Sequence, residues 1–554
     1  MAEQAGPTVS QSDTPGGSVP RLREVQLALV KVLVLVIDAG DPALLSRWAD
    51  EGLLPSMQAI LGRGLVAETR TVEGLYEGAT WPSLYTGVAP GHHGFHRLTQ
   101  IEPGTYDMVP RLPGEFIREE PFWSRLSREG FKVAVLDVPL SGVSEGLNGI
   151  QIVEWGSHDA AYGLRTWPPG LKDEVLGRFG EHPAPAPCDA IDRSPVGFLS
   201  FKERLLAGVD KKCDLTLHYL SQTDWDLFIQ VFTEAHCAGH QAWHLHDPDH
   251  PNYDPAVVAV AGDPVREVYQ AIDEAIGRIL AQVDEHTIVL LLGTHGMAHN
   301  FGVDFLLEEL LVRSGYLTRK PVSVYSQGSG RPSRYVRSIA ALGWRRLPSQ
   351  WRRRLRPHPA AGGARSLVTR YDLTRSKCFP HPNGHLVSGI RFNLKGREPQ
   401  GTVAPGPEMD ELCAELAGLL LDLTETRDGL PLVKRVLRTS ELFRGDRLDH
   451  LPDLLVEWDD RVRVGSRVLK ADLSCRLTAG SSVLGEVEGE YRYCRTGDHR
   501  PEGLLVAVAP GLSSGKLERV VSLLDIAPTI LALFGVTSEG LEGRPISEVV
   551  EGAH

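Results

Sequence analysis

The chain has 554 residues, of which 42% are hydrophobic, and a formal net charge of −13. This length can bury a large core in one domain with insertions, or in two domains, and the acidic balance argues against a protein that coats nucleic acid. Seven cysteines are scattered without a Cys-x-x-Cys pair, which argues against a disulfide scaffold or a cysteine-rich zinc module and favours a reducing cytoplasm.

The N-terminus is predicted to be a disordered tail over residues 1–24, because it is rich in Gly, Pro, Ser and Gln. An apolar region follows at Val25–Ile37. Lys31 interrupts it and no small-residue cleavage site follows, so a signal peptide or membrane anchor is disfavoured. No other segment is long enough to span a bilayer. We therefore expect a cytoplasmic protein without a membrane partner.

The first predicted element is a strand at Val32–Ile37 that stops at a single carboxylate, Asp38. An unbroken apolar run of this length is typical of a parallel strand that is covered on both faces. Ligands of open α/β sheets gather at the carboxyl ends of such strands. Helical spacing of apolar residues follows over residues 42–52 and 53–64, and residues 68–72 predict a short strand.

Thr80 is predicted to lie at the start of a short helix, with Pro82 in its first turn. Backbone N–H groups and the helix dipole favour an anion at such a position. A carboxylate at a strand end and a hydroxyl at a helix start would suit a shared metal ion, so we treat Asp38 and Thr80 as candidate ligands.

Histidines follow the predicted strand Leu227–Phe232. His236 and His240 are four residues apart, so they share a face if this segment is helical, and imidazoles at that spacing are good zinc ligands. The alternative is a polar loop in a histidine-rich chain. His158, after another predicted strand, is a further candidate to line the site, although a loop histidine is more often only solvated.

Two more histidines lie beside predicted strands. His295 follows the apolar run Thr287–Leu292, and His499 precedes the strand Gly503–Val508. Several strands that each carry a metal-binding type of side chain at an end favour a metal site at one edge of the sheet.

Strand and helix patterns alternate along the chain. An apolar strand at Lys132–Leu136 ends at Asp137, and amphipathic patterns predict the helices Val265–Val283, Glu408–Leu423 and Ser522–Phe534. Right-handed crossovers would place such strands side by side, which predicts an α/β fold with a central, mostly parallel sheet sandwiched by helices. We expect one domain over residues 25–554 with cap-like insertions at about 102–210 and 302–458.

The segment Arg313–Tyr371 is basic and irregular, with Trp344 and Trp351 next to arginines. Tryptophans interleaved with arginines are one feature of nucleic-acid binding, but the acidic total charge favours a solvated insertion or a clamp for an acidic substrate. No nucleic-acid partner is therefore expected. Arg391, in a predicted strand and turn, would line a substrate pocket or pair with surface acids.

The motifs around these residues are Val-Leu-Val-Ile-Asp38, Gly-Ala-Thr80-Trp-Pro-Ser, Leu-Tyr-Thr-Gly87, Pro90-Gly-His-His-Gly94, Gly293-Thr-His295-Gly-Met and Gly497-Asp-His499-Arg-Pro. Jointly they resemble the type I phosphodiesterase/nucleotide pyrophosphatase family of the alkaline phosphatase superfamily, over most of the chain. The resemblance implies a parallel sheet sandwiched by helices, with a two-metal site, usually zinc, at the strand ends.

The same resemblance implies roles for single residues. One metal ion would be held by Asp38, Thr80 and His295, and the other by His236, His240 and His499. Thr80 would be the nucleophile, and the phosphothreonine it forms would be hydrolysed by water. The transferred group would be met by the helix start after Thr80 and by His96 or Arg97.

Two positions depart from the family pattern. The family usually has Asp where this chain has His236 and Thr294. Thr294 removes a charged ligand from the metal next to Thr80, whereas His236 keeps a ligand but removes one negative charge. Glu234 is a candidate substitute ligand, and Asp498 is another carboxylate nearby in sequence. A one-metal enzyme, an altered metal preference and a weakened hydrolase all stay open.

The function implied is a metal-dependent hydrolase of phosphodiester or pyrophosphate bonds in a small, nucleotide-like substrate. A phosphomonoesterase or sulfatase on the same scaffold is the enzyme alternative. A formylglycine-type sulfatase is disfavoured because residue 80 is Thr and no Cys-x-Pro-x-Arg motif stands there. A degenerate relative that only binds metal or anion is the third possibility, motivated by Thr294. The oligomeric state stays open.

Overall fold

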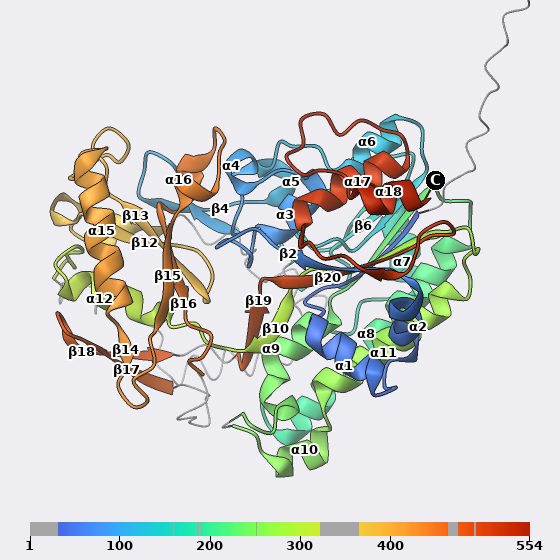
Figure 1. Cartoon of the computed structure of the whole chain (residues 1–554), viewed down its shortest axis with the longest axis horizontal. Coiled ribbons are helices and arrows are strands. Elements are labelled where there is room, and N and C mark those ends of the chain that lie inside the picture. Colours follow the sequence, from blue (N-terminus) through green and yellow to red (C-terminus); the bar gives the residue numbers. More distant parts are fainter. Residues whose placement is uncertain are drawn as a thin grey trace, which may run out of the picture.

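The computed structural model describes residues 32–158, 160–184, 188–189, 191–250, 252–321, 365–463, 475–491 and 495–553 (Figure 1). The predicted tail over residues 1–24 lies outside these ranges, as do Trp344 and Trp351 of the basic segment. Among the described residues, no helix combines the length and the apolar character that a membrane crossing needs.

A ten-stranded sheet forms the centre of the molecule, in the order β21-β2-β20-β9-β1-β8-β5-β6-β7, with β22 also paired to β2. Its strands are β1 (Val32–Ile37), β2 (Leu65–Arg70), β5 (Val133–Leu136), β6 (Gly149–Val153), β7 (Arg165–Trp167), β8 (Leu227–Phe232), β9 (Ile288–Gly293), β20 (Glu502–Val508), β21 (Gly515–Lys516) and β22 (Val521–Ser522). The run from β9 through β1, β8 and β5 to β6 is parallel. Strand β20 is antiparallel to both β9 and β2, and β7 is antiparallel to β6. The predicted α/β class with a mostly parallel sheet is confirmed.

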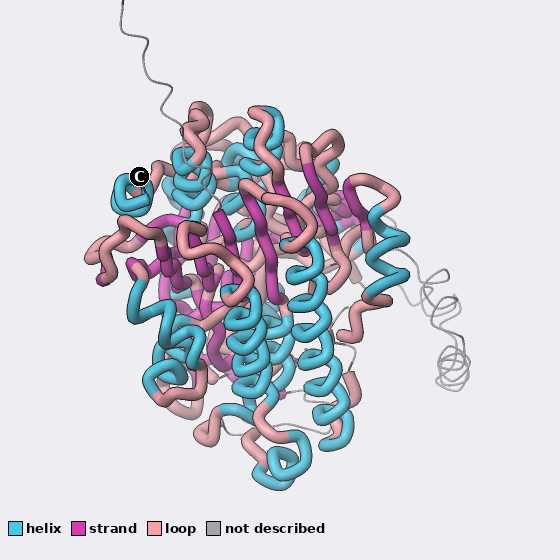
Figure 2. Tube along the Cα trace, turned by 90° about the vertical axis from the view of Figure 1, so that its right-hand side faces the viewer, coloured by secondary structure: helices cyan, strands magenta, loops and turns pink. Residues whose placement is uncertain are grey.

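Helices cover both faces of the sheet, as Figure 2 shows. Successive residues of a strand point to opposite faces, so the odd-numbered residues of β1 pack into one core and the even-numbered residues into another. Helices in the first core are α1 (Pro42–Asp50), α2 (Pro55–Arg63), α8 (Pro195–Leu220) and α11 (Pro264–Leu280). Helices in the second are α3 (Thr80–Thr86), α6 (Phe122–Arg128), α17 (Ile526–Leu533) and α18 (Ser547–Ala553). Every residue of β1 is buried, which explains its unbroken apolar sequence.

The helix α8 was not predicted from the sequence, although it is the longest described helix at 26 residues. Its start carries two recognisable signals. Ser194 accepts a hydrogen bond from the backbone N–H of Gly197, and Pro195 occupies the first turn.

A second group of elements has its own hydrophobic core and lies apart from the central sheet in Figure 1. It contains a four-stranded sheet of β12 (Cys378–His381), β13 (Val387–Phe392), β16 (Leu454–Trp458) and β15 (Val433–Arg438). It also contains α12 (Leu307–Arg313), α15 (Pro407–Leu421) and a sheet of β14 (Thr424–Glu425), β17 (Cys475–Ser481) and β18 (Gly485–Tyr491). These elements begin inside the predicted insertion 302–458 and continue beyond it.

The other predicted insertion, over residues 102–210, needs correction. It includes β5, β6 and β7 of the central sheet and the start of α8, so most of it belongs to the main fold. The Asp137 strand already fitted the parallel pattern, whereas the insertion was inferred from divergent sequence alone. A small sheet of β3 (Thr99–Ile101), β4 (Asp107–Pro110) and β11 (Arg365–Ser366) is the part that lies outside the central sheet.

Leu35→Ala should destabilise the protein by about 2–5 kcal/mol, because Leu35 is fully buried in the central strand and its loss leaves a cavity. Leu421→Ala is the matched control, since Leu421 is 49% exposed at the end of α15. The midpoint of urea unfolding measures both. Equal shifts in the two variants would contradict the central role of β1.

Candidate metal and catalytic site

The predicted metal-binding residues meet at the carboxyl edge of the parallel strands. Because β8, β1 and β9 are adjacent and parallel, the residues that follow them lie at one edge of the sheet. Asp38 follows β1, and His295 follows β9. The helix α9 (Glu234–His246), which follows β8, carries His236 and His240. A short antiparallel ladder of β10 (Gly296–His299) and β19 (Gly497–Arg500) brings His499 opposite Met297.

Three imidazoles converge within this edge. The Nε2 atom of His236 lies 2.8 Å from Nε2 of His499 and 3.2 Å from Nε2 of His240. Ring nitrogens this close repel unless a proton or a metal ion lies between them. Nitrogen ligands of one tetrahedral zinc ion lie roughly 3.3 Å apart, since each Zn–N bond is about 2.0–2.1 Å. The three residues therefore fit a single divalent ion.

The protonation state of these histidines also suits a metal. Burial lowers the pKa of His236, His240 and His499 well below 6.5. The three rings are therefore neutral near pH 7. Nδ1–H of His240 donates to the carbonyl of Gly497 at 2.9 Å, which fixes the tautomer whose Nε2 carries a lone pair. That lone pair accepts a hydrogen bond from Nη1 of Arg495 at 3.1 Å.

Asp38 sits among hydrogen-bond donors. Its Oδ1 atom accepts from Nε1 of Trp81 at 3.1 Å and from Oγ1 of Thr294 at 3.3 Å, and Nε2 of His295 is 3.6 Å away. Thr294, where the family pattern has Asp, thus donates to the remaining carboxylate instead of adding a second one. The Asp38 side therefore offers fewer anionic ligands than the resemblance implied.

Thr80 is buried at the start of α3, and its hydroxyl donates to the carbonyl of Tyr76 at 2.5 Å. The preceding Gly78 is required by packing, because a Cβ atom there would overlap the carbonyl oxygen of His96. A narrow pocket contains Thr80 and joins it to the metal-binding residues; its lining includes Asp38, Thr80, Trp81, His158, His236, His295 and His499.

A cavity of about 300 Å³ opens beside this pocket. Its walls carry His96 and Arg97, together with Arg495, His385 and Glu77. Nε2 of His96 donates to the carbonyl of Pro382 at 3.0 Å, and burial lowers the pKa of His96 to about 3, so this ring is neutral. A groove of about 610 Å³ continues from the cavity past Arg97.

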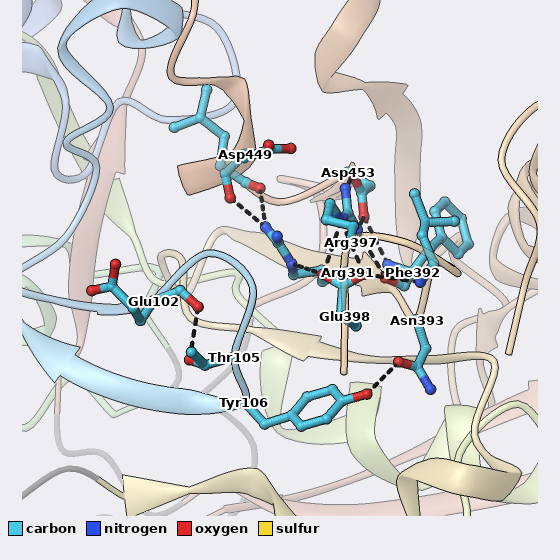
Figure 3. A network of polar contacts seen from close by, with 12 residues as sticks. Glu102, Thr105, Tyr106, Arg391, Phe392, Asn393, Arg397, Glu398, Asp449 and Asp453 are labelled. Atoms are coloured by element: carbon cyan, nitrogen blue, oxygen red, sulfur yellow. Dashed lines mark hydrogen bonds and ion pairs between the residues drawn. The ribbon is translucent and has the colours of Figure 1, made fainter. Parts of the chain in front are cut away.

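Arg391 lies elsewhere, and its predicted substrate contact is corrected. Its side chain is fully buried, with Nε 2.7 Å from Oε1 of Glu398 and Nη1 2.6 Å from the carbonyl of Asp449 (Figure 3). Arg397 reaches the same Glu398 and also pairs with Asp453. Arg391 is absent from the lining of the cavity and the groove. It therefore ties β13 to the neighbouring loops.

Glu234 does not act as the substitute ligand that the sequence left open. Its Oε1 atom lies 2.9 Å from Nε2 of His182 and 3.4 Å from Nζ of Lys212, inside the protein. Asp498 is closer to the site, with Oδ1 3.7 Å from Nδ1 of His240. Burial, followed by repulsion from Glu77, raises the pKa of Asp498 to about 7.

Sequence reasoning assigned no role to four of the residues around the site: Trp81, Glu77, Arg495 and His385. Trp81 stands inside a motif that it did use, Glu77 directly precedes Gly78, and Arg495 stands two residues before Gly497. His385 carried no such signal, because it comes from a loop between β12 and β13 that only the tertiary structure brings near.

A model of the type I phosphodiesterase/nucleotide pyrophosphatase family matches residues 32–471, and the chain belongs to this family. It is thus a phosphodiesterase/pyrophosphatase-type hydrolase. No curated protein sequence matches it.

Two solved structures illustrate the similarity. Phosphonoacetate hydrolase from Sinorhizobium meliloti, in complex with phosphonoformate, is 15% identical with a TM-score of 0.48, over 90% of this chain and 94% of that chain. An inactive variant of murine ectonucleotide pyrophosphatase/phosphodiesterase 5, in complex with AMP, is 12% identical with a TM-score of 0.47, over 94% of this chain and 99% of that chain.

His93, at the end of α4 (Pro90–His93), predicts acid sensitivity. Its ring lies with Nε2 2.9 Å from Oγ of Ser83 in α3, while Nδ1 accepts from the backbone N–H of Phe95 at 3.0 Å. Burial, and then the charge of Arg447, lowers the pKa of His93 from 6.5 to about 3. Protonation of Nδ1 would place its N–H group against the backbone N–H of Phe95.

Because the folded pKa is below the unfolded value, the stability from a neutral His93 is complete above about pH 6.5 and is lost as pH falls toward 3, by about 1.4 kcal/mol per pH unit. Urea unfolding should be measured between pH 7 and 4. The free energy of unfolding of His93→Gln should fall less steeply with decreasing pH than that of the wild type, by a slope equivalent to about one bound proton. Identical slopes would contradict the assignment.

Proposed function

We propose that this chain hydrolyses phosphodiester or pyrophosphate bonds in small, nucleotide-like substrates, with Thr80 as the nucleophile. One observation carries the proposal: Thr80 shares a narrow pocket with Asp38 and with two of the converging imidazoles, His236 and His499. A hydroxyl alone is a weak nucleophile, and activation needs a base or a cation nearby. This pocket supplies the Asp38 carboxylate as a base and imidazoles that would hold a cation.

His236, His240 and His499 would hold a divalent ion, which we propose to be zinc, since three neutral imidazoles form a common zinc ligand set. Bound there, the ion would act as a Lewis acid for the phosphoryl oxygens. Asp38 and His295 stay our candidates for the ligands of a second ion beside Thr80. Thr294 and Trp81 already donate to Asp38, which weakens that second set.

The reaction proceeds in two displacements. Oγ1 of Thr80 attacks phosphorus, its proton passes to a base in the pocket, and the P–O bond to the leaving alcohol or nucleotide breaks. The leaving oxygen takes the electron pair and a proton. Water then cleaves the phosphothreonine ester, which returns the threonine hydroxyl and releases phosphate or a phosphomonoester. Asp38, with its hydrogen bonds to Trp81 and Thr294, is held in place throughout.

Arg97 and Arg495 would bind the phosphoryl oxygens, because both line the cavity next to His236 and His499. A cavity of about 300 Å³ suits a small substrate, and the adjoining groove would take the leaving group. Glu77, on the same wall, would disfavour a highly charged substrate. Five described cysteines are free and buried, which supports a cytoplasmic location.

A second candidate is a degenerate relative that binds an anion without turnover. The hydrogen bond from Arg495 to Nε2 of His240 favours it, because a guanidinium uses the lone pair that a metal ion would need. The two candidates differ in metal content, which decides between them.

Thr80→Ala should lower kcat on bis-p-nitrophenyl phosphate by at least about 10³-fold, because the nucleophile is lost, while leaving bound metal unchanged. Thr86→Ala is a matched control: this buried threonine lies on the same helix and makes the same kind of bond, with Oγ1 2.6 Å from the carbonyl of Pro82. Near-normal turnover by Thr80→Ala would refute the nucleophile assignment.

His499→Ala should reduce tightly bound zinc and abolish turnover, because it removes one of three converging ligands. Metal analysis of the purified protein measures the first effect and the phosphodiester assay the second. His218→Ala, on α8 beside Gln222, serves as the control. Wild-type protein that binds no metal and has no activity with any added divalent ion would favour the degenerate relative.

A further inference from the structure

A second cluster of metal-binding side chains adjoins the three histidines and shares one of them. It consists of His158, His236 and Cys237, whose donor atoms all lie within 4.8 Å of one another and are all buried. Sγ of Cys237 is 3.5 Å from Nδ1 of His158, and the rings of His158 and His236 have centroids 4.3 Å apart. Neither His158 nor Cys237 belongs to the ligand sets that the family resemblance implies.

A further thiol stands beside this cluster. Cys188 is fully buried, and His158 acts on it electrostatically. Nε2 of Gln241 donates to Sγ of Cys188 at 3.5 Å, which directs the sulfur toward α9. Both cysteines are free thiols. The donor atoms that lie within 4.8 Å of one another are those of His158, His236 and Cys237.

A neutral imidazole has one lone pair, so His236 would serve both clusters as a bridging imidazolate, whose ring proton is released to water when the second ion binds. Its Nε2 atom faces His240 and His499, whereas its Nδ1 atom is buried and has no hydrogen-bond partner among the described residues. A buried ring nitrogen without a partner costs about 1–3 kcal/mol, and a ligand at that atom would offset the cost. The orphaned nitrogen is an observation independent of the two thiols.

The segment that carries His158 is fixed by its neighbours. The carboxylate of Asp137 accepts from the backbone N–H groups of Trp155 at 2.8 Å and Gly156 at 2.7 Å. Oγ1 of Thr233, the residue before α9, donates to the carbonyl of Gly156 at 2.6 Å, and Lys212 donates to the same hydroxyl at 3.0 Å. The His158 segment and the α9 segment are therefore held against each other by the fold, as a metal site requires.

We propose that His158, His236 and Cys237 form a second metal site with a thiolate ligand, adjacent to the three-histidine site. Sulfur and imidazole donors select zinc and its soft relatives over magnesium or calcium, which prefer oxygen. The thiolate also supplies negative charge that three neutral imidazoles lack, which favours a buried divalent cation. The site does not depend on the proposed hydrolytic activity.

A disulfide between Cys188 and Cys237 is the competing use of the Cys237 sulfur. It would consume the thiolate ligand and exclude a metal ion. A thiol titration of the unfolded chain, purified with a non-thiol reductant, separates the two states because it counts the free thiols.

The test is cobalt substitution of the full-length, metal-stripped protein under that reductant. Thiolate ligands give Co²⁺ a near-ultraviolet charge-transfer absorption that histidine ligands do not. Two variants remove one donor each from different segments, Cys237→Ser and His158→Gln. Cys213→Ser is the matched control, a buried free cysteine on α8 whose Sγ lies 3.7 Å from the carbonyl of Ala275.

The wild type should bind two equivalents of cobalt and show the thiolate band. Cys237→Ser should lose the band and one equivalent, and His158→Gln should weaken both, while Cys213→Ser keeps both. His499→Ala should keep the band, which distinguishes failure of the three-histidine site from failure of this one. Absence of the band in the wild type, its persistence in Cys237→Ser, or two thiols fewer than the seven cysteines predict would overturn the proposal. Far-ultraviolet circular dichroism checks that each variant is folded; if both are unfolded, the wild-type band and stoichiometry alone decide.

Discussion

The convergence of imidazoles at one edge of a parallel sheet is the constraint on which the candidate site depends. Strands β8, β1 and β9 must be adjacent, parallel and in register for Asp38, His295 and the α9 histidines to meet. Three ring nitrogens that face one another at hydrogen-bond distance are unfavourable unless a proton or a cation lies between them. The hydrophobic burial of the strands on both faces supplies the rigidity that holds them there. The core thus stabilises an arrangement that the polar groups alone would not adopt.

The site has fewer anionic metal ligands than the ligand pattern that its family membership implies. At the Thr80 side, Asp38 already accepts hydrogen bonds from Trp81 and Thr294, and Glu77 is a second carboxylate that lines the pocket. Near the other histidines, Arg495 adds a positive charge, and burial favours the neutral form of Asp498. A divalent ion in such surroundings has few anions to neutralise it. The buried thiol of Cys237 next to His236 is therefore chemically significant, because its thiolate would supply a further anionic ligand.

Buried ion pairs stabilise both the main fold and the second group of elements. In the main fold, Lys212 lies 3.2 Å from Asp137 and 3.4 Å from Glu234, and it joins the ends of β5 and β8 to the segment that bears His158. In the second group of elements, the Arg391–Glu398 pair fixes β13 against neighbouring loops. Each pair is buried and hydrogen-bonded, so removing one partner would leave an uncompensated charge. These residues affect the site by fixing the positions of the elements around it.

The sequence by itself determined the α/β class, the buried strands and the nearness of Asp38, His236, His240, His295 and His499, because apolar runs that end in polar residues obey the local rules of parallel sheets. Only the tertiary structure decided which charges are paired and which side chains join the site. From the sequence, Arg391 was a candidate for the substrate pocket, but its side chain is buried against Glu398. Cys188, His158 and His385 come from loops whose positions depend on packing between distant segments. The limits of the 102–210 insertion were wrong for the same reason. Periodicity reports which face of an element is buried, and it carries no information about which loop will lie against it.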